Sequence, residues 1–131
     1  MFAFASPGAP RVLLILLLTP DAQNVRDKVR KHKSDALAEL RERNGGEKIQ
    51  YLILDLSPVS HIDTTALQTV EDMILTQRNE GCVVCFCNPG MTVIKRFARS
   101  GIVDLVGREH FFSSVIDAVQ WCLTDMESLV H

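Results

Sequence analysis

The stretch Tyr51–Leu67 constrains the fold of this chain more than any other part of the sequence. It opens with an apolar, β-favouring run and reaches Pro58, where a strand must end because proline has no amide proton to donate. After a short loop, Asp63 stands in front of a segment with apolar residues at helical spacing, and aspartate in that place caps a helix. The first turns of this helix carry Thr64, Thr65, Ala66, Leu67, Val70 and Ile74. The sequence therefore predicts a buried strand, a loop and a capped helix in succession.

Two further apolar runs, Val12–Leu18 and Cys82–Cys87, are each too short for a membrane helix, which needs about 20 residues. Both suit strands that are buried on their two faces. A secretory leader is not expected, because Arg11 follows Pro-Gly-Ala-Pro instead of opening the chain.

The cysteines are Cys82, Cys85, Cys87 and Cys122. Three of them crowd one expected strand, where they cannot readily pair with one another. The Cys-x-x-Cys spacing lies inside an apolar run, and no second Cys/His pair follows at zinc spacing. We therefore expect buried thiols in a reducing compartment and no metal site.

The remaining segments alternate between strand and helix patterns, which predicts an α/β domain over residues 1–131 with a mixed sheet of four to five strands and four packed helices. Met1–Ala5 is a short apolar piece that suits an edge strand, and Ser6–Pro10 reads as a linker. The first two helices are expected from Pro20–Asp21 to a stop at Asn44–Gly46 and from Asp63 to about Asn79. The other two are expected from Met91 to Ser100–Gly101 and from Ser113 or Ser114 through Met126. In the last helix Leu123 belongs to the apolar stripe, and Trp121 is expected to pack beside that stripe. Between the last two helices, Ile102–Leu105 is expected to be irregular and Glu109–Phe112 to form a brief last strand.

The charge pattern gives little reason to expect a nucleic-acid partner, because the net charge is −2. A basic run, Arg26–Lys33, is most simply a solvated helix face, and contact with an acidic partner or lipid headgroups is the alternative.

Enzyme signatures are missing from the sequence: there is no phosphate-binding Gly-rich loop, no nucleophile elbow and no pair of histidines on a helix face. Ser57, Ser60, His61 and Asp63 could be imagined as a hydrolytic group, but a triad needs three converging side chains and helix capping already explains Asp63. No catalytic residue and no cofactor is predicted. A small hydrolase using His61 and Asp63 is kept as the least favoured class.

The helix start at Asp63 allows two interpretations. Thr64 and Thr65 are either ordinary first-turn residues or the acceptors of a phosphate. A helix N-terminus tolerates an anion, and a phosphate there would add almost two negative charges beside the Asp63 carboxylate. Such a change could switch off a partner by repulsion while the fold survives.

The segment LILDLSPVSHIDTTAL, with its Asp-hydroxyl-hydroxyl-small-Leu turn after a buried strand, resembles the signature of the STAS domain. STAS domains are anti-sigma-factor antagonists in bacteria and the cytoplasmic C-terminal part of SulP-family anion transporters. Three segments resemble the transporter branch in particular: Ala22–Val29, Gly101–Gly107 and Phe111–Val119. The sequence departs from the family at Ala66, where glycine is usual, and at Pro20–Asp21, where aromatic residues are usual.

The resemblance implies the STAS fold and a regulatory domain that supports folding, delivery and control of a sulfate or related anion transporter. Its partners would be the parent's membrane domain, a second STAS copy, cytosolic regulators and a nucleotide, with the domain in the cytoplasm and the parent in the plasma membrane. The alternative is a free-standing anti-sigma-factor antagonist switched by a kinase at Thr65, the position phosphorylated in bacterial antagonists; in plant permeases the suspected residue corresponds to Thr64. Candidate nucleotide or anion loops are Ser57–Thr65 and Asn88–Thr92, with Ser57, His61, Asn88 and Gly90, because both follow the carboxyl ends of strands.

Overall fold

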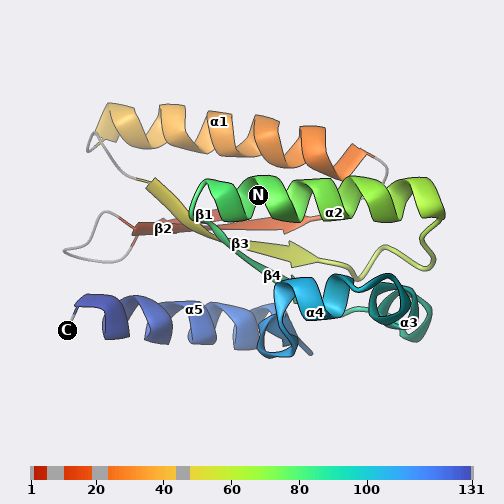
Figure 1. Ribbon diagram of the computed structural model, residues 1–131. Helices are drawn as coiled ribbons and strands as arrows, with labels where there is room; N and C mark the ends of the chain where they lie inside the picture. The colour runs from red at the N-terminus through yellow and green to blue at the C-terminus, as the bar shows by residue number, and fades with distance from the viewer. Residues whose placement is uncertain (1, 6–10, 19–23, 44–47, 131) are drawn as a thin grey trace.

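Five strands form one sheet in a computed structural model that describes residues 2–5, 11–18, 24–43 and 48–130. The strands follow one another across the sheet in chain order (Figure 1). They are β1 (Phe2–Ala5), β2 (Arg11–Leu17), β3 (Lys48–Asp55), β4 (Val83–Cys87) and β5 (Phe111–Phe112). The edge strand β1 is antiparallel to β2, and the other neighbours are parallel. The sheet is therefore mixed, as the sequence predicted.

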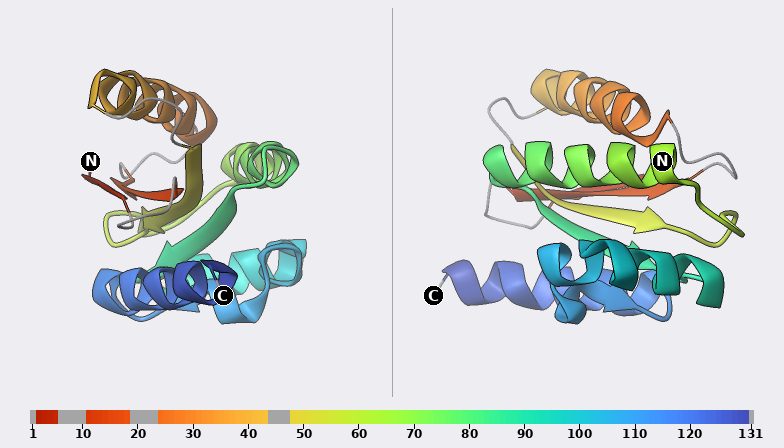
Figure 2. Two further views of the ribbon diagram at one scale, coloured as in Figure 1. Left: turned by 90° about the vertical axis from the view of Figure 1, so that its left-hand side faces the viewer. Right: turned by 45° about the vertical axis from the view of Figure 1, so that its right-hand side comes forward.

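Five α-helices and one short 3₁₀ helix accompany the sheet in the described residues. They are α1 (Val25–Arg43), α2 (Thr64–Asn79), α3 (Met91–Ser100), α4 (Ile102–Val106), the 3₁₀ helix η2 (Arg108–His110) and α5 (Val115–Val130). Figure 2 shows α1 and α2 on one side of the sheet and α5 on the other. The sequence places α2, α3 and α5 correctly. The expected starts and stops of the first helix at Pro20–Asp21 and Asn44–Gly46 lie outside the described residues, as does the linker Ser6–Pro10.

Strand β3 shows why its sequence is apolar without interruption. Leu52 and Leu54 point into the larger core beneath α1 and α2, and Tyr51 and Ile53 point into a second core beneath α5. All four side chains are fully buried. A central strand covered on both faces cannot alternate between apolar and polar residues, because neither face meets water.

Helix α5 is held on the second face by a small aromatic group around Trp121. The indole ring makes ring contacts with Tyr51, His110 and Phe112, with centroid separations of 6.3, 5.0 and 6.0 Å. The Tyr51 hydroxyl also donates a hydrogen bond to the Asp125 carboxylate on α5. Trp121 thus packs the helix against the sheet, which confirms the expected structural role of this residue.

Three sequence-based expectations about the last third of the chain were wrong in detail. Ile102–Leu105, expected to be irregular, lies in the short helix α4 (Ile102–Val106), so the described residues contain five α-helices and not four. The last strand contains only Phe111–Phe112, because the preceding residues form η2. Leu123, expected in the buried stripe of α5, is 41% exposed.

Candidate functional site

Asp63 caps α2 as the sequence predicted. Its backbone is extended, with φ −89° and ψ 176°, and its Oδ1 atom accepts a hydrogen bond from the Ala66 amide at 2.8 Å. Thr64 and Thr65 follow in the first turn, and both side chains are exposed. Ala66 is only 3% exposed, so its part in the cap is its backbone amide and its methyl group lies in the core. The two hydroxyls, unlike Ala66, are accessible to another molecule.

Asp55 joins the two loops that follow β3 and β4. One oxygen of its carboxylate, Oδ1, accepts hydrogen bonds from the Ser57 amide at 2.9 Å, from the Ser57 hydroxyl, and from the Asn88 side-chain amide at 3.1 Å. Asn88 adopts a positive φ of 55°, which asparagine tolerates better than most residues. Ser57 and Asn88 were expected at the candidate loops from the sequence, whereas Asp55, which connects them, was not. The signal that could have revealed it is its position as the last residue of a strand whose parallel neighbour ends in Asn88.

The charge state of Asp55 follows from this network. Partial burial raises the pKa of the carboxyl group, but the hydrogen bonds from the Ser57 side chain and backbone and from Asn88 outweigh burial and hold the pKa below its ordinary value. A carboxylate is therefore present at the meeting point of the two loops at neutral pH.

Stability should depend on pH through this carboxylate. Because its pKa is lower in the folded chain than in the unfolded chain, the stabilisation is complete above the unfolded value of about 3.9 and is lost as the pH falls through the folded value. We expect Asp55→Asn to reduce the loss of unfolding free energy between pH 5 and about pH 2, measured by urea unfolding.

Asp72→Asn is the matched control for that measurement, since Asp72 is exposed on α2 and outside this network. Equal acid sensitivity of the parent chain and Asp55→Asn would show that the network does not stabilise the fold.

The four residues considered as a hydrolytic group do not all converge on one another in the structure. The Ser57 hydroxyl donates to Asp55, Ser60 Oγ lies 3.3 Å from His61 Nδ1, and Asp63 Oδ1 accepts from Ala66. Ser60 and His61 are both exposed. Gly90, at the other loop, is the N-cap residue of α3, with φ −69° and open space around it. The structure thus places the two candidate loops together through Asp55 and Asn88. The Ser60–His61 contact does not include Asp63, whose Oδ1 atom accepts from the Ala66 amide.

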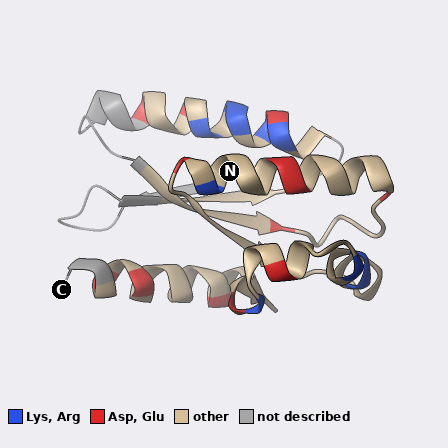
Figure 3. Cartoon of the chain, in the orientation of Figure 1, with Lys and Arg blue, Asp and Glu red and all other residues tan. Residues whose placement is uncertain are grey.

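Part of the basic run on α1 is structural. Lys28 donates to the Leu17 carbonyl at 2.8 Å, and Lys33 forms an ion pair with Glu80 at 2.7 Å while also donating to Gln77. Burial and the Lys28 charge lower the pKa of His32. Arg30 and Lys31 are exposed, and Figure 3 shows basic residues grouped along α1. The expectation that the basic run is simply a solvated helix face is therefore incomplete. Lys28 connects α1 to the end of β2, and Lys33 connects it to the end of α2.

Membrane-spanning helices and metal-binding clusters are both absent from the described residues. None of the described helices has both the length and the apolar character needed to cross a bilayer. The described part of the chain also contains no grouping of three His, Cys, Asp or Glu side chains able to hold a metal ion.

Sequence comparison links the chain to membrane transporters. It is 40% identical over 77 residues to the probable sulfate transporter 4.2 of Arabidopsis thaliana, and the match covers 59% of this chain and 11% of that protein. A second Arabidopsis relative, the chloroplastic sulfate transporter 4.1, is 39% identical over 82 residues, covering 63% of this chain and 12% of that protein. The chain therefore spans about one eighth of the length of these relatives at most.

Comparison with solved structures and with family models agrees with the fold described above. The STAS domain of a SulP transporter from Vibrio cholerae superposes with a TM-score of 0.71 at 25% identity, covering 88% of this chain and 84% of that domain. A Thermotoga maritima protein named as a candidate anti-sigma factor antagonist superposes with a TM-score of 0.50 at 14% identity, covering 90% of each chain, which shows a shared fold alone. The family model for the STAS domain matches residues 19–118, and the chain therefore belongs to the STAS domain family.

Proposed function

We propose that this chain is the cytoplasmic STAS domain of a SulP-type transporter of sulfate or a related anion, and that it supports the folding, delivery and regulation of that transporter. The observation that carries the proposal is the 40% identity with a plant sulfate transporter over 77 residues. The 25% identity with a bacterial SulP STAS domain supports the same assignment. In this proposal residues 1–131 form one STAS domain, its first partner is the parent's membrane domain, and the parent lies in the plasma membrane.

The test is a chimera in which this chain replaces the STAS domain of the Arabidopsis sulfate transporter 4.2. We expect uptake of labelled sulfate in cells that lack their own sulfate transport. Ile53→Asp in the chimera should abolish delivery, because Ile53 is fully buried and an unpaired charge there unfolds the domain. A chimera that reaches the membrane in the same amount as the parent and carries no sulfate would contradict the proposal.

Exposed hydroxyls at the start of α2 support a regulatory contact there. We expect Thr64→Glu and Thr65→Glu each to change sulfate uptake by the chimera by about tenfold, since one like-charge or lost polar contact at an interface is worth about 1.4 kcal/mol. The melting temperature should change by only a few degrees, because an acidic residue is tolerated in the first turn of a helix.

Thr76→Glu is the matched control, since Thr76 is exposed on the same helix two turns or more beyond the first turn. If both first-turn variants transport as the parent does, these hydroxyls are not a regulatory site.

The anti-sigma-factor-antagonist alternative predicts phosphate incorporation at Thr65 by a kinase-like partner. Its structural support is fold similarity at 14% identity, so the transporter assignment is favoured by the higher identities to the sulfate transporters. We propose no enzymatic activity.

Nucleotide binding at Ser57, His61, Asn88 and Gly90 stays a prediction, as do a second STAS copy and cytosolic regulators as partners. The Ser57 hydroxyl and the Asn88 amide both donate to Asp55, so a phosphate would have to compete with that carboxylate for the same donors. Chemical-shift changes on titration with ATP and GTP would test the prediction.

A further inference from the structure

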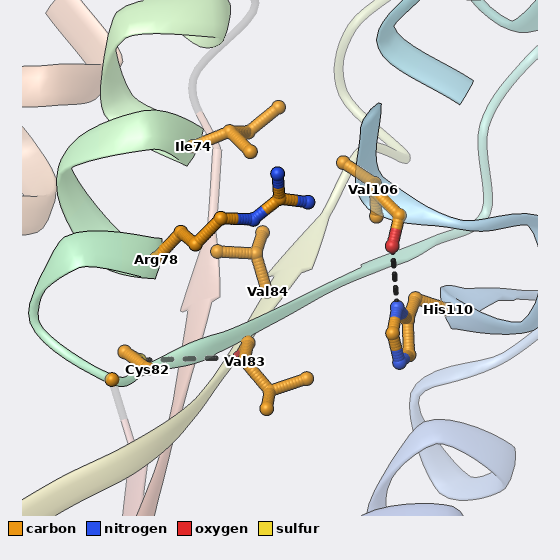
Figure 4. A pocket seen from close by; sticks show the side chains of 8 residues that line it. Ile74, Arg78, Cys82, Val83, Val84, Val106 and His110 are labelled. Atoms are coloured by element: carbon orange, nitrogen blue, oxygen red, sulfur yellow. Dashed lines mark hydrogen bonds between the residues drawn. The ribbon is translucent and has the colours of Figure 1, made fainter. Parts of the chain in front are cut away.

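A pocket of about 290 Å³ lies at the end of the domain where α2 stops and β4 begins. Figure 4 shows side chains from α2, from the turn and strand that follow it, and from α4 and η2 around the opening. The floor of the pocket is apolar: Ile74, Val84 and Val106 belong to the larger core and are 2, 6 and 7% exposed, so each presents only a small part of its surface to the opening. Arg78 is 13 residues beyond Thr65 on the same helix, so the pocket lies about 20 Å from the candidate regulatory turn, given a rise of about 1.5 Å per residue.

The pocket lies beside the part of β4 that the short last strand does not reach. Strand β5 pairs with β4 only opposite Phe86 and Cys87. The first residues of β4, Val83 and Val84, therefore have no strand beside them on that edge in the described structure, and both line the pocket. Helix η2 comes near this edge instead, and its His110 forms part of the wall. A strand edge without a neighbour leaves room that side chains of the domain do not fill.

Arg78 gives the apolar pocket one positive charge. Its guanidinium reaches across the opening towards Val106 (Figure 4) and donates one hydrogen bond, from Nη2 to the Leu105 carbonyl. A guanidinium has five N–H donors, so most of its donor capacity is not used by that bond. Lys33–Glu80 is the one ion pair between described residues, so no described carboxylate lies within ion-pair distance of the Arg78 guanidinium. The opposite wall is fixed, because His110 Nδ1 donates to the Val106 carbonyl at 2.6 Å.

We propose that this pocket binds an organic carboxylate of the medium-chain fatty-acid class, with the hydrocarbon chain against Ile74, Val84 and Val106 and the carboxylate on Arg78. A pocket of this size is at the lower end of the range for small-molecule sites, about 300–1,000 Å³, which suits a short chain and excludes a long one. Arginine recognises carboxylates through paired N–H···O bonds. Inorganic sulfate does not fit this chemistry, because the apolar wall offers it no donors to replace lost water. The inference does not rest on the proposed transporter function.

The test is a titration of the 131-residue chain, followed by NMR chemical shifts, with sodium octanoate, octanol and sodium sulfate. We expect octanoate to shift signals of Ile74, Val84 and Val106 and to bind about tenfold more tightly than octanol, the difference that hydrogen bonds to a charged group supply. Hexanoate should bind about tenfold more weakly than octanoate, because it buries two fewer methylene groups. Sulfate at the same concentration should shift none of these signals.

Two arginine variants separate the head-group contact from general binding. Arg78→Met keeps an apolar stem and removes the charge, so octanoate should bind about tenfold more weakly while octanol is unaffected. Arg99→Met is the matched control, since Arg99 is an exposed arginine on α3 that does not line the pocket, and it should change neither affinity. Should Arg78→Met fail to fold, Arg78→Lys keeps the charge without the planar fork and should retain part of the preference for octanoate over octanol.

Four results would overturn the proposal. These are equal binding of octanoate and octanol, binding of sulfate at the same residues, octanoate binding that Arg78→Met leaves unchanged, and no binding of octanoate to the folded chain. Equal binding of octanoate and octanol would mean unspecific apolar contact, and sulfate binding would mean a site for inorganic anions. An unchanged affinity in Arg78→Met would mean that octanoate binds without Arg78. No binding of octanoate would mean that the pocket takes no ligand of this class.

Discussion

Replacing Phe97 by alanine is expected to lower the free energy of unfolding by about 3–5 kcal/mol, the range for removing a large aromatic side chain from a core. Phe97 is fully buried on α3, and its ring contacts Phe86 of β4 and Phe111 of β5 with centroid separations of 5.4 and 6.4 Å. Phe86 and Phe111 also stack on each other at 5.4 Å. The three rings join α3 to the two last strands, so alanine would leave a cavity where they meet.

Urea unfolding followed by circular dichroism measures this effect. Met91→Ala is the control on the same helix: Met91 is 71% exposed, and the expected change is below about 0.5 kcal/mol. A loss below about 1 kcal/mol for Phe97→Ala would mean that α3 does not pack on the sheet as described.

The thiols of the native chain should react with maleimide or iodoacetamide at least about a hundredfold more slowly than those of the unfolded chain, because the thiolate is the reacting form. Cys82, Cys85, Cys87 and Cys122 are all buried and not in disulfides. Burial and the nearby Asp55 charge raise the pKa of Cys87 to about 12. Contact with Cys122 and burial raise the pKa of Cys85 well above its usual range. At pH 8 Cys85 and Cys87 are therefore almost entirely protonated, and all four thiols are buried.

Mass spectrometry of the labelled chain, with and without urea, gives the number and position of modified thiols. Thr92→Cys adds an exposed thiol on α3 and should be labelled at once under native conditions. Rapid native labelling of Cys85 or Cys122 would show that α5 separates from the sheet in the folded state, since Cys85 of β4 and Cys122 of α5 both lie in the core between them.

Much of the architecture follows from local pattern. The apolar runs predict β2, β3 and β4, and the capping signals at Asp63 and the Ser113–Ser114 pair predict the starts of α2 and α5. Ser114, and not Ser113, caps α5, because its hydroxyl oxygen accepts a hydrogen bond from the Asp117 amide at 3.1 Å. These predictions succeed because strand burial and helix capping depend on residues close together in the chain.

What the sequence did not reveal depends on tertiary contacts or very short elements. Helix α4 has five residues, too few for helical periodicity to be recognised, and it lies between Gly101 and Gly107, both with positive φ. The Asp55–Asn88 bond joins residues 33 positions apart. The charged pocket at Arg78 requires the carboxyl end of α2, the open edge of β4 and the η2 segment to meet, and no local signal places Arg78 and His110 at one opening.

The sequential order of the strands bears on how the domain is made during synthesis. Each strand after β1 finds a sheet neighbour already made when it leaves the ribosome, because adjacent strands are consecutive in the chain. The second face of the sheet differs, because α5, which covers Leu13, Tyr51, Ile53 and Cys85, emerges after all five strands. A nascent chain whose α5 is still inside the ribosome therefore exposes this apolar face to water. We expect chaperones to bind the chain most strongly during that interval.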